Sequence, residues 1–167
     1  MSQPGKDQDK MTQEQTKDYA RRISQANRTE LTVIVYDITL QHLSDCNAAF
    51  EKRDLEGFRH SIKQAQRFLC ELMSTLDLKY PLAVSLLRLY EFAQRIIVHC
   101  DVAGTTDNLE VATRILSRLK DSFDSIKSQD TEGPVMENTE PVYAGLTYGK
   151  GTLNETDIRS DNRGFFA

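Results

Sequence analysis

The sequence predicts an all-α protein, built as an antiparallel up-down-up-down four-helix bundle with a disordered N-terminal segment and a C-terminal tail. Apolar residues recur at steps of three and four in four segments, near residues 27–50, 54–77, 81–102 and 107–127. Short loops join these segments, as in simple bundles. No strand-like alternation of apolar and polar residues competes with the helical steps between residues 27 and 126.

The first predicted helix has a strong start signal. Asn27 is a good N-cap residue, and Glu30 follows it at capping-box spacing. The helix is apolar on more than one face. Asp54 caps the second predicted helix, whose apolar residues form a heptad-like seam for antiparallel packing.

The third and fourth predicted helices are also delimited by local signals. Pro81 suits the first turn of the third helix, and Gly104 marks its end. Asp107 and Glu110 lie three residues apart, which again is the spacing of a capping box. We therefore expect the fourth helix to begin at this pair.

The two ends of the chain differ in composition from the predicted bundle domain, residues 19–127. Residues 1–18 are polar and are expected to be disordered. Residues 128–141 contain two prolines and are interpreted as a linker. Residues 142–167 are rich in glycine but also carry aromatic side chains. This tail is interpreted either as a disordered end or as a short motif that docks on its own bundle or on a partner.

Composition and motifs argue against several classes of function. The net charge is −4, without the basic surface that nucleic-acid binding needs, and no apolar run approaches the ~20 residues that span a bilayer. The three cysteines are far apart and are expected to be reduced thiols. Neither a Glu-x-x-His metal motif nor a nucleophile signature occurs. We therefore expect no catalysis, cofactor, metal, nucleic-acid binding or membrane insertion.

Four features in consistent order resemble the flagellin-specific export chaperones, the FliS family. The first helix, NRTELTVIVYDITLQHL, contains the Tyr36–Asp37 pair, and the second ends in LMSTLDL. The third carries LRLYEFAQRII, and Tyr19 and Ile23 resemble the N-terminal tyrosine and apolar residue of the family. Asn27–Arg28 stand where the family often has Ser/Thr-Pro, but the cap chemistry is kept. The ending from Val142 is not part of the family pattern.

The resemblance implies a cytoplasmic (cytosolic) chaperone. Members bind the C-terminal segment of unassembled flagellin, prevent premature polymerisation and deliver flagellin to the flagellar type III export apparatus. An apolar bundle surface suits an amphipathic client helix. The residues expected to bind flagellin, each of which also fits an ordinary bundle core, are Tyr36, Leu40, Leu43, Tyr90 and Ile97. Tyr19 and Ile23 are expected to plug the client groove when it is empty.

One alternative is a histidine phosphotransfer bundle that uses His60. Such domains are also four-helix bundles with an exposed histidine, and Lys63 has the right relation to His60. They usually have a small residue four positions after the histidine. Here Gln64 occupies that position and would crowd the imidazole.

Overall fold

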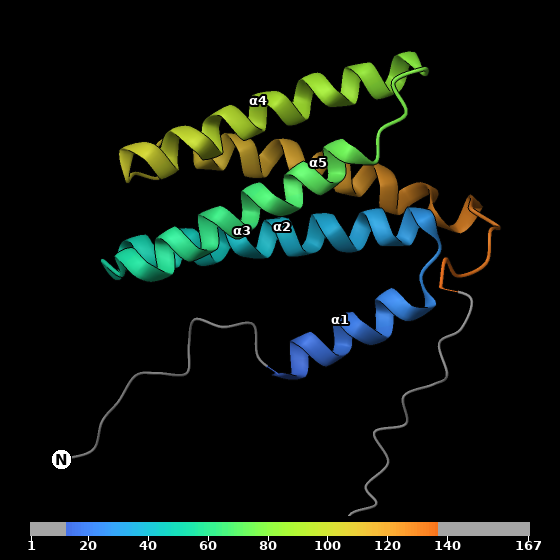
Figure 1. Cartoon of the computed structure of the whole chain (residues 1–167), viewed down its shortest axis with the longest axis horizontal. Coiled ribbons are helices and arrows are strands. Elements are labelled where there is room, and N and C mark those ends of the chain that lie inside the picture. The colour runs from blue at the N-terminus through green and yellow to red at the C-terminus, as the bar shows by residue number, and fades with distance from the viewer. Residues whose placement is uncertain (1–12, 137–167) are drawn as a thin grey trace, which may run out of the picture.

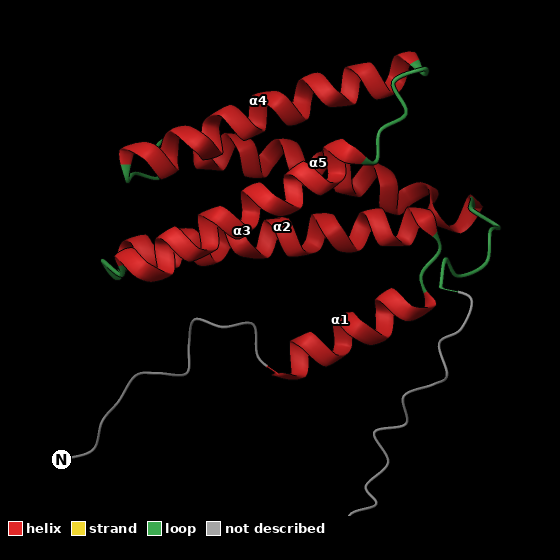
Figure 2. Ribbon diagram, in the orientation of Figure 1, coloured by secondary structure: helices red, strands yellow, loops and turns green. Residues whose placement is uncertain are grey.

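The computed structural model describes residues 13–136, with side chains from residue 16 onward. Within this range the chain forms helices and loops without a strand, as Figure 2 shows, so the all-α prediction is confirmed. The helices are α1 (Gln13–Gln25), α2 (Arg28–Glu51), α3 (Leu55–Ser74), α4 (Pro81–Ala103) and α5 (Leu109–Ile126), followed by the 3₁₀ turn η1 (Lys127–Gln129) (Figure 1). None of these helices is long and apolar enough to cross a bilayer.

The predicted helix ends are correct for α2 and α4, whereas α3 ends at Ser74 rather than near residue 77 and the start of α5 differs from the prediction. Asn27 and Glu30 form the full capping box, since the Asn27 side chain accepts from the Glu30 amide at 2.8 Å and Glu30 accepts from the Asn27 amide at 3.1 Å. Gly104 ends α4 with φ +65°, a left-handed conformation that glycine adopts without strain. The box expected at Asp107 does not form. Asn108 precedes α5 instead, in a left-handed conformation and without a side-chain cap.

The four long helices α2 to α5 enclose the larger of two apolar clusters. Helix α2 packs against α3 and α5, and α4 packs against the same two helices. The larger cluster is made of buried side chains from all four helices: Tyr36, Leu43, Cys46, Ala49, Phe58, Ile62, Ala65, Leu69, Leu72, Tyr90, Ala93, Ile97, Cys100, Leu109, Ala112 and Leu116. Cys46 and Cys100 lie inside it, whereas Cys70 on α3 is exposed.

Helix α1 lies outside this group, along the first half of α2 (Figure 1). It covers the smaller cluster, which consists of the buried residues Ala26, Ile34 and Ile38 with the partly buried Tyr19, Ile23, Leu31 and Phe68. Disorder was expected over residues 1–18, and the structure corrects this for residues 13–18, because α1 begins at Gln13. Tyr19 and Ile23 give this polar segment an apolar side that packs on α2, and packing of one face is what stabilises a short helix.

The segment after α5 also differs from the expected linker, residues 128–141. Residues 128 and 129 belong to η1, and residues 130–135 return to the start of α2 through hydrogen bonds. Residues 1–12 lie outside the described residues, as do residues 137–167, which include the end of the expected linker and all of the expected tail, residues 142–167.

Candidate functional site

The five residues expected to bind a client lie together, but mostly in the interior. The exposed fractions of Tyr36, Leu43, Tyr90 and Ile97 are 0, 0, 1 and 0%. Leu40 is partly buried and packs against the larger cluster. Four of the five side chains therefore offer no surface to a partner in this structure, and their contact with a client stays a prediction.

Tyr36 and Tyr90 form a buried polar pair between α2 and α4. Their hydroxyl groups are hydrogen-bonded to each other, and the Tyr36 ring also packs 5.7 Å from the ring of Phe123 on α5. Burial raises the pKa of both phenols, so both hydroxyls stay protonated. Because a buried hydroxyl without a partner is costly, the pair favours one register of α2 against α4.

Exposed apolar side chains are concentrated on α4 and on the loop before it. The large apolar residues of this region with exposed side chains are Leu78, Tyr80, Leu82, Leu89, Phe92, Val98 and Val102. Leu82, Leu89 and Phe92 are spaced seven and three residues apart, which places them on one side of the helix. We call these three residues the α4 face; their exposed fractions are 71, 40 and 46%. None of the residues that the sequence analysis expected to bind flagellin belongs to this face.

The two residues expected to act as a plug lie on the other side of α2. Tyr19 and Ile23 are half-buried against the smaller cluster. Between them Arg22 donates to Asp37 at 3.2 Å, and Lys120 of α5 pairs with the same carboxylate at 2.6 Å. The bond to Asp37 raises the pKa of Lys120. Asp37 thus joins α1, α2 and α5 through charge.

A family model for the flagellar protein FliS matches residues 11–130. The chain belongs to the FliS family. The match runs from α1 through η1, so it includes both the four long helices and α1. FliS proteins are flagellar export chaperones rather than a known enzyme family. No curated protein matches the chain.

Membership of the FliS family favours the chaperone interpretation over phosphotransfer. His60 is exposed on α3, beside Leu55, Glu56, Arg59 and Lys63 at a shallow hollow, and Gln64 is half-buried one turn later. The described residues contain no group of three or more His, Cys, Asp or Glu side chains arranged to hold a metal ion.

Proposed function

We propose that this FliS-family chain is a cytoplasmic export chaperone that binds the C-terminal segment of unassembled flagellin. In this role it prevents premature polymerisation and delivers flagellin to the flagellar type III export apparatus, without catalysis. The family match over residues 11–130 carries the proposal.

The chaperone unit that we propose is an antiparallel up-down-up-down bundle of α2 to α5, with α1 packed against α2. Two observations support this arrangement. Each of the four long helices packs against two others, and loops of a few residues connect them in sequence. Short connections between long helices favour antiparallel neighbours.

The α4 face is the surface that we propose for the client. An amphipathic client helix needs an exposed apolar surface, and Leu82, Leu89 and Phe92 supply one at helical spacing. Ordering a disordered client costs about 2–5 kcal/mol, so the contact should extend beyond these three residues. Leu40 is a further candidate contact, whereas Tyr36 of α2 supports α4 through its hydrogen bond to Tyr90.

Tyr19 and Ile23 retain the proposed role of a plug over an apolar part of α2. Their partial burial on the smaller cluster supports this role, because α1 covers side chains that would otherwise meet water. A helix attached by two half-buried side chains can be displaced without unfolding the bundle.

Calorimetric titration with flagellin tests the proposal. Intact flagellin should bind, and flagellin that lacks its C-terminal segment should not. Leu89→Ser/Phe92→Ser should weaken binding about tenfold or more, because both side chains would contact the client. The control is Leu55→Ser, which changes an exposed apolar residue on α3. Equal affinity for the two flagellins would contradict the proposed function, and equal loss in both variants would contradict the α4 face.

A further inference from the structure

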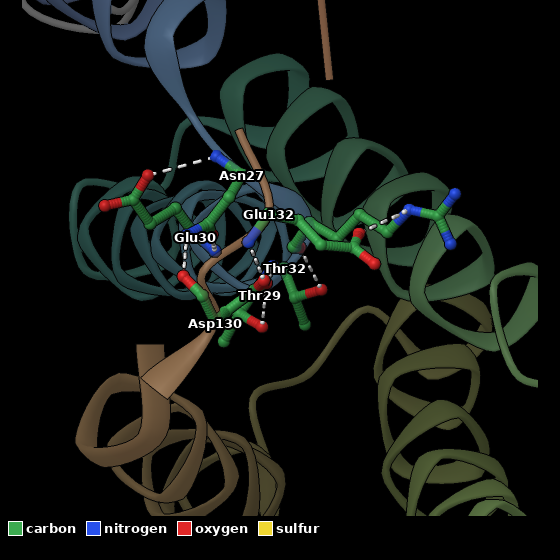
Figure 3. A network of polar contacts seen from close by, with 7 residues as sticks. Asn27, Thr29, Glu30, Thr32, Asp130 and Glu132 are labelled. Carbon is green, nitrogen blue, oxygen red and sulfur yellow. Dashed lines mark hydrogen bonds and ion pairs between the residues drawn. The ribbon is translucent and has the colours of Figure 1, made fainter. Parts of the chain in front are cut away.

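The segment after η1 turns back across the corner between α1 and α2. This segment, residues 130–135, is named the clasp. Figure 3 shows Asp130 pointing at the first turn of α2, next to Asn27 and Thr29. Only the first residue of the clasp lies within the family match, which ends at residue 130.

Asp130 forms the hydrogen bonds between the clasp and the start of α2. One carboxylate oxygen, Oδ2, accepts from the backbone amide of Thr29 at 3.2 Å and from its hydroxyl at 2.7 Å. The carbonyl of Asp130 accepts from the side-chain amide of Asn27 at 3.2 Å. The first amides of a helix lack partners within it, and the capping box satisfies those of Asn27 and Glu30, so Asp130 complements the box by satisfying a third amide, that of Thr29.

The far end of the clasp bonds to the connection between the helices. The amide of Val135 donates to the carbonyl of Ala26 at 3.1 Å. Ala26 and Asn27 are the only two residues between α1 and α2, and both are buried. The clasp therefore holds both residues whose backbone angles set the direction of α1. The ion pair of Arg28 with Glu132, at 3.6 Å, is largely exposed and adds little.

The other attachments of α1 are weak enough for the clasp to matter. Within the described part of α1, the apolar contacts to the smaller cluster come from Tyr19 and Ile23, both half-buried. The Arg22–Asp37 pair is partly exposed, and such pairs contribute about 0–1 kcal/mol. Fixing the two connecting residues lowers the entropy that α1 loses when it docks.

We propose that the clasp is a latch that holds α1 on α2, so that opening the clasp releases α1 and uncovers the smaller cluster. The latch is independent of the identity of the client. Its consequence for client access rests on the proposed function, in which α1 acts as a plug.

Hydrogen exchange of the full-length protein tests the latch. Asp130→Ala should speed exchange of the α1 amides about two- to tenfold, the factor expected for one net hydrogen bond. Amides in the central turns of α3 and α4 should be unchanged. The matched control is Asp121→Ala, which removes an exposed carboxylate from α5. Val135→Pro, which removes the donor to Ala26 and leaves Asp130 in place, should also speed exchange in α1.

Three results would overturn the latch. Faster exchange confined to the first turn of α2 would make Asp130 a helix cap only. Unchanged exchange in α1 would also contradict the latch, and so would faster exchange through all helices.

Titration of Asp130→Ala with flagellin separates the latch from the proposed function. If the plug and the latch are both correct, affinity should rise by about the same factor as exchange in α1. If α1 is released and affinity is unchanged, the latch stands and the plug fails. If wild type binds no flagellin, the proposed function fails while the exchange result still decides the latch.

Discussion

Helix α2 borders two apolar clusters that differ in how they are closed. The larger cluster is surrounded by four helices, and side chains such as Tyr36 and Leu43 are fully buried in it. The smaller cluster is covered by α1, through the half-buried Tyr19 and Ile23. Full burial of a large apolar side chain contributes about 1.5–3 kcal/mol, so the two clusters differ greatly in stability. One helix thus borders a fully enclosed core on one side and a half-buried layer on the other.

The largest effect should come from the larger cluster. Leu43→Ala should lower the free energy of unfolding by about 2–5 kcal/mol, because a cavity remains in a tightly enclosed site. Urea denaturation measures the loss. The control, Leu55→Ala at an exposed position, should stay within about 0.5 kcal/mol of wild type. Unchanged stability of Leu43→Ala with weakened flagellin binding would instead make Leu43 a client contact, as the sequence analysis expected.

The hydroxyl pair should have a smaller but still global effect. Tyr36→Phe should cost about 1–3 kcal/mol in unfolding free energy, because the buried hydroxyl of Tyr90 loses its partner. Adding Tyr90→Phe should cost less than the sum of the two single changes. Additive losses in this double-mutant cycle would show that the two hydroxyls do not act as a pair.

The smaller cluster should respond locally. Tyr19→Ala/Ile23→Ala should reduce the helical circular dichroism signal of the protein, because α1 would be less helical. The free energy of unfolding in the main transition should fall by less than about 1 kcal/mol, since α1 opens separately. Light scattering of the client-free protein should increase, and affinity for flagellin should rise slightly. Arg21→Ala, at an exposed position on α1, is the control. A large fall in affinity would mean that Tyr19 and Ile23 contact the client directly.

The smallest effect is a dependence of stability on pH at His42, beside the smaller cluster. The ring of His42 stacks on Phe68 of the smaller cluster, with centroids 5.6 Å apart. Burial lowers the pKa of His42 below its ordinary 6.5, and the charge of Asp45 partly opposes this shift. The unfolded chain therefore binds a proton that the folded chain does not, so the stability from neutral His42 is full above pH 6.5 and declines below it.

Denaturation at pH 7.5 and 5.5 checks this dependence. In His42→Gln the free energy of unfolding should decline less between pH 7.5 and 5.5 than in wild type. In His99→Gln, which changes an exposed histidine, the decline should equal that of wild type. An unchanged slope in His42→Gln would show that other groups cause the decline.

Sequence patterns predicted most of what local chemistry decides, with the capping box expected at Asp107 as the exception, and missed what distant contacts decide. The Asn27–Glu30 box and the glycine end of α4 depend on neighbouring residues, and both are present. The hydrogen bond between Thr29 and Asp130 joins residues 101 positions apart, so no local pattern predicts it. The start of α1, before Tyr19, was missed for the same reason, because the apolar side of this helix is defined by what α2 presents.

The candidate site was harder to predict because helical spacing does not separate a core from an exposed face. Tyr36 and Tyr90 lie at positions that suit either, and the structure places both inside. Phe92 was missed because it falls outside the main apolar seam of α4. Which apolar side of a helix is covered depends on which other helices lie next to it. The spacing of apolar residues within one helix does not predict those neighbours.

The placement of the three cysteines makes the natural chain suitable for single-site labelling. Burial raises the pKa of Cys46 to about 12 and also raises the pKa of Cys100, so both thiols are enclosed and poor nucleophiles. Cys70 is exposed on α3, 3.8 Å from the side-chain nitrogen of Gln94 on α4. A maleimide dye should therefore attach at Cys70 alone, and its fluorescence would report on the α3–α4 surface without any engineered cysteine.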